Sequence, residues 1–166
     1  MLFEDEFSLS NTATISSTWS PVGEQPVISC KQIKRERVTG FGSVNPLTGQ
    51  LLVNFAQKGN NLTFKKHLKN ILRTYKDKQT IIVYVDNVRY HHAKALKPFL
   101  YAHSKLKIRY LPAYSPDLNP VERVWWYIRK RITHNRYLSS LKQRIAKFWQ
   151  RFSCCLSPNN LLNIFV

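Results

Sequence analysis

Three acidic side chains in the sequence have the type and the setting for metal-dependent chemistry. Asp86 directly follows the apolar run 81–85, which is short and rich in β-branched residues, as is typical of a strand buried on both faces. An ionised carboxylate at the end of a buried strand needs a partner or a metal ion. Glu122 follows after 35 intervening residues at the start of a predicted helix, and Asp5 lies in an apolar segment near the N-terminus. Brought together, three carboxylates suffice for Mg²⁺, which takes few such ligands and keeps its waters.

The charge of the chain predicts a polyanionic partner. There are 26 Lys and Arg residues against nine Asp and Glu, a net charge of +17. Residues 1–60 hold five of each sign, whereas residues 61–152 hold 21 basic and four acidic residues. Nucleic acid is the usual ligand of such a surface, and a ribosomal-type or merely soluble basic protein is the alternative. Salt-dependent contacts to a DNA backbone are expected from the predicted helices, with the candidates Lys65, Lys69, Arg129, Lys130, Arg131 and Arg144.

The acids and the charge together predict phosphodiester chemistry. Two Mg²⁺ ions roughly 3.5–4 Å apart clamp the attacking and leaving oxygens, so no serine, cysteine or tyrosine nucleophile is required. One ion would activate water, or later a DNA 3′-hydroxyl, and the other would stabilise the leaving 3′-oxygen. Asp5, Asp86 and Glu122 are therefore the candidate catalytic and metal-binding residues.

Each acid also has a purely structural interpretation. Asn119, Pro120 and Glu122 match the N-cap, N1 and N3 positions of a capping box, so the spacing alone divides evenly between a helix cap and a metal ligand. Asp5 has an acidic residue on either side, and a solvated acidic patch would explain that triplet. Asp117, in a Ser-Pro-Asp sequence, is more typical of a turn.

Polar residues near the acids are candidates for supporting roles. His91 and His92 follow Asp86 by five and six residues and indicate either the exposed start of a helix or groups that contact the metal ligands or DNA. Asn87 either orients Asp86 or fills a turn. The candidates for contacting the metal ligands or DNA are Asn87, His91, Asn119 and Arg123.

The hydrophobic pattern predicts elements that would position these groups. Strands are expected at 2–9, 34–44, 51–55, 81–85 and 106–111, and helices at 62–76, 91–103 (bent at Pro98), 121–132 and 138–152. The order is βββαβαβα plus a C-terminal helix, which predicts an α/β fold with a mixed sheet flanked by helices. In such a sheet the first strand can lie beside the fourth, so that Asp5 and Asp86 become neighbours and a following helix brings Glu122 across.

Length and composition favour one domain, residues 1–152, followed by a tail, residues 153–166. Cys30, Cys154 and Cys155 have no CxxC spacing, so neither zinc nor a disulfide is predicted and a reduced cytosolic setting fits. There is no apolar run near 18 residues to cross a membrane, and the acidic start is not a signal peptide.

Several motifs, taken together and in order from about residue 2 to 150, resemble the DDE transposases, with the bacterial insertion-sequence group of the mariner superfamily as the nearest branch. They are Asp5-Glu6 after an apolar start, Trp19 to Gly23 around Pro21, Asn45-Pro46-Leu47-Thr48-Gly49, Val85-Asp86-Asn87 with His91, and LPAYSPDLNPVERVW from Leu111 to Trp125. The last two blocks are highly specific in combination.

The resemblance implies a ribonuclease-H-like fold, a site for two Mg²⁺ ions in which Mn²⁺ substitutes, and cut-and-paste transposition. Position by position, Asp5 matches the first acid, Asp86 the second and Glu122 the third. The implied partners are double-stranded DNA, as transposon ends and target, and a second copy of the chain in a homodimer. The implied setting is the bacterial cytoplasm, in association with the nucleoid.

In one respect the chain departs from the family pattern. Family members carry helix-turn-helix modules before the first acid, whereas only four residues precede Asp5 here. The expectation is a separate upstream helix-turn-helix polypeptide, as in a split reading frame, or a decayed copy. The alternatives to an active transposase domain are an inactive, basic DNA-binding remnant and another ribonuclease-H-like nuclease that acts on RNA–DNA hybrids or junctions.

Overall fold

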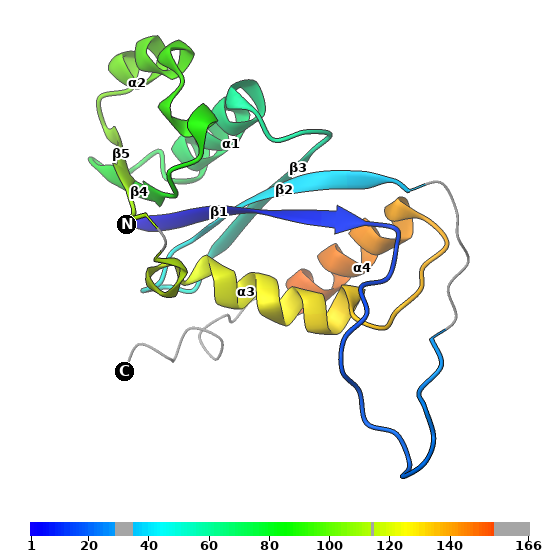
Figure 1. Cartoon of the computed structure of the whole chain (residues 1–166). Helices are drawn as coiled ribbons and strands as arrows, with labels where there is room; N and C mark the ends of the chain where they lie inside the picture. The colour runs from blue at the N-terminus through cyan, green and yellow to red at the C-terminus, as the bar shows by residue number, and fades with distance from the viewer. Residues whose placement is uncertain (29–34, 114, 155–166) are drawn as a thin grey trace.

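The protein folds around a five-stranded mixed sheet with helices on both faces (Figure 1). A computed structural model describes residues 1–28, 35–113 and 115–154. The strands are β1 (Leu2–Ser10), β2 (Arg37–Val44), β3 (Leu51–Ala56), β4 (Ile81–Val85) and β5 (Leu106–Tyr110). Their order across the sheet is β3-β2-β1-β4-β5, with β1, β2 and β3 antiparallel and β1, β4 and β5 parallel. The predicted mixed sheet, with the first strand beside the fourth, is confirmed.

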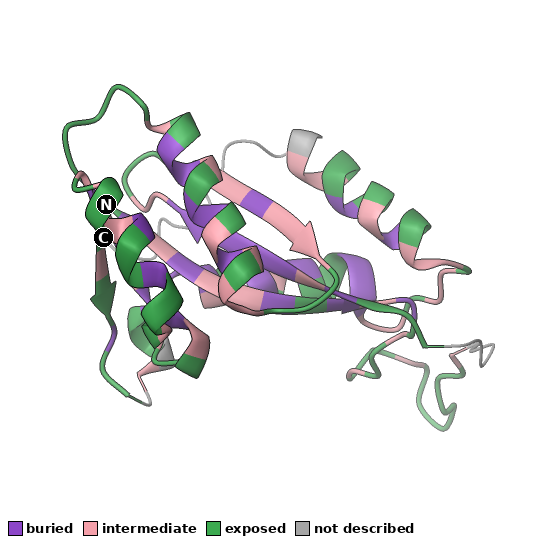
Figure 2. Cartoon of the chain, turned by 90° about the horizontal axis from the view of Figure 1, so that it is seen from above, coloured by how far each residue is buried: buried purple, intermediate pink, exposed green. Residues whose placement is uncertain are grey.

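Helices cover the two faces of the sheet unequally. Helix α1 (Asn61–Thr74) packs on one face, and α3 (Val121–Ile128) and α4 (Leu141–Cys154) pack on the other (Figures 1 and 2). The shorter elements are 3₁₀ turns η1 (Arg89–His92), η2 (Lys94–Leu96) and η3 (Pro116–Leu118), helix α2 (Lys97–Ala102) and the π-helical turn η4 (Arg129–Thr133).

The central strand β1 contributes to two separate cores because its side chains alternate between the faces. Leu2 packs into the core against α1, with Phe64, Leu68 and other buried residues of that helix. Phe7 and Leu9 pack into the core against α3 and α4. Both faces of β1 are therefore covered, which decides where its three acidic side chains can lie.

Two glycines of β2 leave room for aromatic side chains that pack on the sheet. A Cβ atom on Gly42 would lie 2.1 Å from the ring of Trp125, and one on Gly40 would lie 2.2 Å from the ring of Phe7. Trp125 is fully buried and lies 4.2 Å, centroid to centroid, from Phe7. The absence of a side chain at Gly42 thus lets α3, which carries Trp125 and Glu122, lie close to the sheet.

The structure corrects some predicted boundaries. The helix expected at 91–103 is two 3₁₀ turns followed by the six-residue α2, and Pro98 lies in the first turn of α2, where its missing N–H costs nothing, instead of bending a helix interior. The helix expected at 121–132 changes to a π turn after Ile128, and the His134 N–H donates to the Arg129 carbonyl at 2.8 Å.

Further boundaries differ at the ends of the chain's elements. Strand β2 begins at Arg37 rather than at residue 34, and α4 runs to Cys154. Residues 153 and 154 of the predicted tail thus belong to α4, while position 34, Cys30 and residues 155–166 lie outside the described residues. Among the residues that are described, no helix has both the length and the apolar character needed to cross a bilayer.

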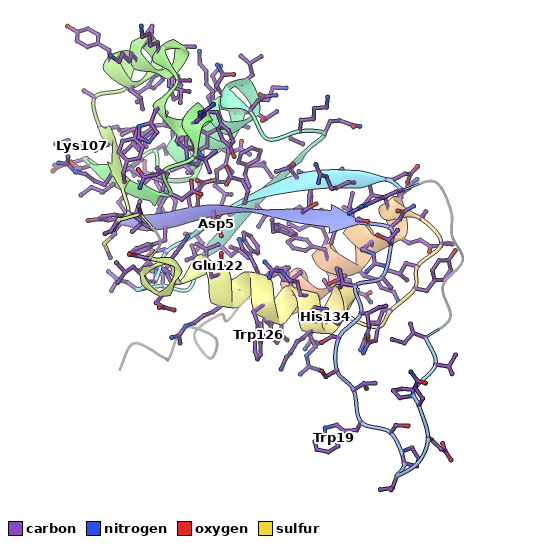
Figure 3. All side chains as sticks on the ribbon, in the orientation of Figure 1. Asp5, Trp19, Lys107, Glu122, Trp126 and His134 are labelled. Atoms are coloured by element: carbon purple, nitrogen blue, oxygen red, sulfur yellow. The ribbon has the colours of Figure 1, made fainter. Side chains whose placement is uncertain are left out.

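The connection between β1 and β2 extends away from the body of the molecule (Figure 1). Its base is held by the backbone of Thr14, whose N–H donates to Thr133 at 3.2 Å, and by the Asn135 side chain, which bonds the backbone of Ser16. Trp19, labelled in Figure 3, is 99% exposed, and Val22 is fully exposed. This segment therefore presents large apolar side chains to solvent.

Candidate active site

Asp5, Asp86 and Glu122 line one cavity of about 410 Å³ beside the carboxyl end of β4. Asp5 comes from the middle of β1, Asp86 stands one residue beyond β4, and Glu122 belongs to the first turn of α3. Asp5 and Glu122 lie close together between the strand and the helix in Figure 3. Other lining residues are Asn87, Val88, Leu111, Pro112, Ala113, Ser115 and Asn119. The structure thus brings the three predicted acids together.

Asp5 is crowded by like charges. Burial, together with the carboxylates of Glu122, Glu6 and Asp86, raises the pKa of its carboxyl to about 8. One carboxylate oxygen from each of Asp5, Glu6 and Asp86 lies within 4.8 Å of the other two. Such crowding disfavours the ionised form unless a cation neutralises it, and all-oxygen donors suit hard divalent ions. The donor set therefore fits the Mg²⁺ that the resemblance implies.

Asp86 differs from Asp5 because hydrogen bonds hold its charge. Burial raises the pKa of Asp86, but bonds from the His91 ring and from the Val88 backbone N–H outweigh burial and leave the pKa below its usual value. His91 Nδ1 lies 3.0 Å from Asp86 Oδ1, and the Val88 N–H donates at 3.1 Å. Asp86 is therefore an ionised carboxylate with a fixed orientation at neutral pH.

His91 links Asp86 to Glu4 and Glu6, on the face of β1 that is covered by α1. Its Nε2 lies 3.1 Å from Glu6 Oε1 and 3.8 Å from Glu4 Oε2. Burial lowers the pKa of His91, but hydrogen bonds to Asp86 and Glu6 raise it to about 10, so the ring is a cation at neutral pH. The Tyr90 hydroxyl also donates to Glu6. His91, which was predicted from its spacing to support Asp86, thus holds the Asp86 carboxylate in place.

Sequence reasoning missed the roles of Glu4 and Glu6. Glu4 is fully buried, and among the described residues neither of its carboxyl oxygens has a hydrogen-bond partner. Burial, aided by Glu6, raises the pKa of Glu4 well above its usual range, so its neutral form is favoured. The signal was the alternation along β1, since Glu4 and Glu6 share the face of Leu2. This alternation predicts that Glu4 and Glu6 are buried only once β1 is known to have a neighbouring strand on each side.

Two asparagines brace the pocket. Asn87 donates from its side chain to the Leu111 carbonyl at 2.6 Å and so ties the exits of β4 and β5 together. Asn119 is buried, accepts from the Val121 N–H at 3.2 Å and donates to the Glu4 carbonyl at 3.4 Å. The start of α3 is thereby pinned to β1.

Of the two interpretations that the spacing left open for Glu122, the capping box does not form. Pro120 is the N-cap of α3 and no side chain caps it, while the Glu122 side chain lines the cavity instead. Arg123 is exposed, as is Asp117 in the turn η3. His92 stacks on Tyr110, with 4.1 Å between the ring centroids, outside the pocket.

The predicted contacts to a DNA backbone divide into two groups. Lys69, Arg129, Lys130 and Arg131 are exposed and Lys65 is half-buried, so all five remain predictions. Arg144 is wrong as a DNA contact because it is fully buried. It donates to the carbonyls of Ile132 at 2.8 Å, Arg136 at 2.9 Å and Asn11 at 3.3 Å, and so serves the packing of α4.

Comparison with known proteins agrees with this site. A family model described as "DDE superfamily endonuclease" matches residues 1–145. The chain belongs to the DDE superfamily endonucleases. The family predicted from the motifs is therefore confirmed.

Named relatives point the same way. This DDE chain is 29% identical over 159 residues to the Shigella sonnei protein named "Insertion element IS630 uncharacterized 39 kDa protein". The aligned region covers 95% of this chain and 46% of the relative. Its fold matches the mariner Mos1 paired end complex with Mg with a TM-score of 0.72 at 15% identity, over 93% of this chain and 48% of that one. It also matches the Mos1 strand transfer complex with a TM-score of 0.69 at 16% identity, over 93% of this chain and 47% of that one. The predicted ribonuclease-H-like fold is confirmed, and the chain spans about half the length of these relatives.

Proposed function

We propose that this chain is the catalytic domain of a transposase, which cleaves DNA strands at transposon ends and joins the 3′ ends to a target. The convergence of Asp5, Asp86 and Glu122 on one cavity, in a chain of the DDE family, supports the proposal most directly. The three acids come from three elements, and nothing in packing alone requires like charges to gather in one cavity.

Under this proposal the three carboxylates hold two Mg²⁺ ions, for which Mn²⁺ substitutes. The chemistry supplied there is a lower pKa for an attacking water or 3′-hydroxyl and neutralisation of the leaving oxygen. Asp86 offers a ligand that is ionised and oriented by His91 before any cation arrives. Asp5 gives up a proton when it becomes a ligand, because burial and its neighbours keep its pKa near 8 in the absence of a cation.

We further propose double-stranded DNA, as transposon ends and target, for the basic half of the chain, and a homodimer as the active form. The exposed apolar side chains of the β1–β2 connection, Trp19 and Val22 among them, support a partner surface. An upstream helix-turn-helix polypeptide would supply recognition of the ends. The setting would be the bacterial cytoplasm, in association with the nucleoid.

The direct test compares Asp86→Asn with Asp77→Asn, which removes the same charge from an exposed turn. We expect Asp86→Asn to lower Mg²⁺-dependent nicking of plasmid DNA by about 10³-fold or more, because several kcal/mol of charge stabilisation at the reacting oxygens are lost. Binding of the same DNA in EDTA should be unchanged. Equal nicking by Asp86→Asn and the parent would contradict the assignment.

Two further measurements separate the alternatives. An inactive remnant would bind DNA but not Mg²⁺ or Mn²⁺. A different ribonuclease-H-like nuclease would cut RNA–DNA hybrids or junctions without joining a 3′-hydroxyl end to a second duplex, whereas a transposase domain joins it.

A further inference from the structure

A second group of possible metal ligands lies on the other face of β1 from the catalytic acids. By the alternation of a strand, Glu4 and Glu6 share the face of Leu2, which packs against α1. Asp5, between them, lines the acidic cavity instead. One carboxylate oxygen of Glu4, one of Glu6 and one ring nitrogen of His91 all lie within 4.8 Å of one another. These three residues are not among the described residues that line the acidic cavity.

The Glu4 carboxyl is the clearest sign of a ligand at this place. Its side chain is 0% exposed, and among the described residues neither of its oxygens has a hydrogen-bond partner. His91 Nε2 lies 3.8 Å from Glu4 Oε2, which is longer than a hydrogen bond. A buried carboxyl without a hydrogen bond costs free energy, so Glu4 indicates a site where an ion binds.

The ring of His91 is oriented as in a metal ligand. Its Nδ1 lies 3.0 Å from Asp86 Oδ1 and 3.3 Å from the Asp86 carbonyl oxygen, so Nδ1 carries the proton of that hydrogen bond. In the neutral ring the lone pair then belongs to Nε2, which is the nitrogen near Glu4 and Glu6. Histidines that bind metals commonly have a carboxylate on the nitrogen that does not bind.

The spacing of the donor atoms fits a small divalent ion. Zn²⁺ holds nitrogen and carboxylate oxygen at about 2.0–2.2 Å, which places neighbouring ligands of a tetrahedron roughly 3.3 Å apart. His91 Nε2 lies 3.1 Å from Glu6 Oε1 and 3.8 Å from Glu4 Oε2, so small adjustments of the side chains suffice. The Tyr90 hydroxyl donates to Glu6, and carboxylates that bind metals are commonly supported by such a bond.

The donor types favour zinc over magnesium. Mg²⁺ takes oxygen ligands and keeps several waters, whereas an imidazole nitrogen suits Zn²⁺. The place is enclosed, since the side chains of Glu4 and His91 are 0% exposed and the ring of Phe64 lies 4.2 Å, centroid to centroid, from that of His91. Two carboxylates balance the charge of one divalent ion there. The catalytic acids differ, because they offer oxygen alone.

We propose that Glu4, Glu6 and His91 bind one Zn²⁺ ion, separate from the ions at the catalytic acids. The ion joins the middle of β1 to the turn η1 and holds the histidine that orients Asp86. Binding displaces one proton from Glu4 and one from His91 Nε2, as is usual when a metal takes protonated ligands. The proposal concerns the metal alone and does not depend on the proposed function.

The test compares Glu4→Gln with Glu24→Gln, the same substitution at an exposed position. The full chain is purified from zinc-supplemented medium and dialysed against millimolar Mg²⁺, which competes for the catalytic acids. Its metals are then measured by inductively coupled plasma mass spectrometry. We expect about one Zn²⁺ per chain in the parent and in Glu24→Gln, and about tenfold less or lower in Glu4→Gln.

A double variant, Asp5→Asn with Glu122→Gln, separates the zinc site from the catalytic acids. It should keep the parental zinc, because neither residue belongs to the proposed ligands. Zinc that is lost from the double variant but kept in Glu4→Gln overturns the proposal. So does a parent without zinc, or equal zinc in the parent and Glu4→Gln. Iron or manganese in place of zinc overturns the assignment of the metal.

Thermal melting gives a second readout and verifies folding. Glutamine has the size of glutamate and no charge, so Glu4→Gln should fold in EDTA like the parent. Zn²⁺ added to the metal-free parent should raise the melting temperature by about 5 °C or more and leave that of Glu4→Gln unchanged. Equal rises in both proteins overturn the proposal. No readout uses DNA, so a parent that binds zinc but never nicks contradicts the proposed function alone.

Discussion

Asp5 is surrounded by the carboxylates of Glu6, Asp86 and Glu122 in a partly buried pocket, and its pKa is raised to about 8 as a result. In the unfolded chain the pKa is about 3.9. An acid whose pKa rises on folding costs stability once the pH exceeds its unfolded pKa, because folding must then return a proton to it. The cost grows up to about pH 8 and stays constant above.

The variant Asp5→Asn should therefore be more stable than the parent without metal. We expect the difference in unfolding free energy to be near zero at pH 4 and to grow by up to about 1.4 kcal/mol per pH unit toward pH 8. Thermal or urea unfolding in EDTA measures it. Millimolar Mg²⁺ at pH 8 should stabilise the parent and leave Asp5→Asn unaffected, whereas a difference that does not change with pH would refute the electrostatic account.

At the level of single residues, the sequence predicted part of the site. Asp86 and Glu122 were predicted because each acid stands at the end of an element in a region with few other acids. Asp5 became convincing only through the family resemblance. The roles of Glu4 and Glu6 depend on which strands flank β1, and the burial of Arg144 depends on the packing of α4 against the loop after η4. Neither is a property of local sequence.

Helix α3 is the element on which the site depends, since it carries Glu122. Its distance from the sheet is set by the ring of Trp125, which packs against Gly42. The N-terminal end of α3 is tied to β1 by Asn119. A change in the contact between Trp125 and Gly42 should therefore displace Glu122 relative to Asp5 and Asp86.

The variant Gly42→Ala tests this link between packing and catalysis. Its Cβ would lie 2.1 Å from the ring of Trp125, which is fully buried, so we expect a loss of about 1–3 kcal/mol in stability and reduced nicking by the folded protein. Gly59→Ala is the control, because its Cβ would meet nothing closer than 3.4 Å. Parental stability and activity in Gly42→Ala would show that α3 tolerates displacement.

The strands and longer helices could be predicted because they have clear periods and turn residues between them. The segment 89–102 could not, since its apolar pattern begins only at Leu96 and a proline follows two residues later. The change from α to π geometry at Arg129 also has no local signature. It follows from tertiary contacts such as the Thr133 bond to the Arg129 carbonyl.

At the scale of the whole molecule, folding must accommodate a buried histidine. His67 of α1 is fully buried between β2 and β3, where Nε2 lies 2.7 Å from the Ser43 hydroxyl and Nδ1 lies 2.7 Å from Asn54 Oδ1. Burial lowers the pKa of His67 to about 3, so the ring is neutral in the folded protein. In the unfolded chain it takes up a proton near pH 6.5.

Stability should therefore fall in acid through His67. Its contribution is complete above pH 6.5 and is lost by about 1.4 kcal/mol per pH unit as the pH falls toward 3, because only the unfolded chain binds the proton. Urea unfolding of the parent and of His67→Gln at pH 7, 6, 5 and 4 isolates this contribution, since the other acids titrate in both proteins. Parallel curves for the two proteins would contradict it.

The central claim is that Asp5, Asp86 and Glu122 together hold divalent ions, and Mn²⁺ binding measured by electron paramagnetic resonance tests it most directly. We predict two Mn²⁺ ions bound per chain of the parent and of Asp117→Asn, which removes an exposed acid near the same cavity. We predict lost or much weakened binding in Asp5→Asn, Asp86→Asn and Glu122→Gln. Binding in these three variants equal to that of the parent would contradict the account.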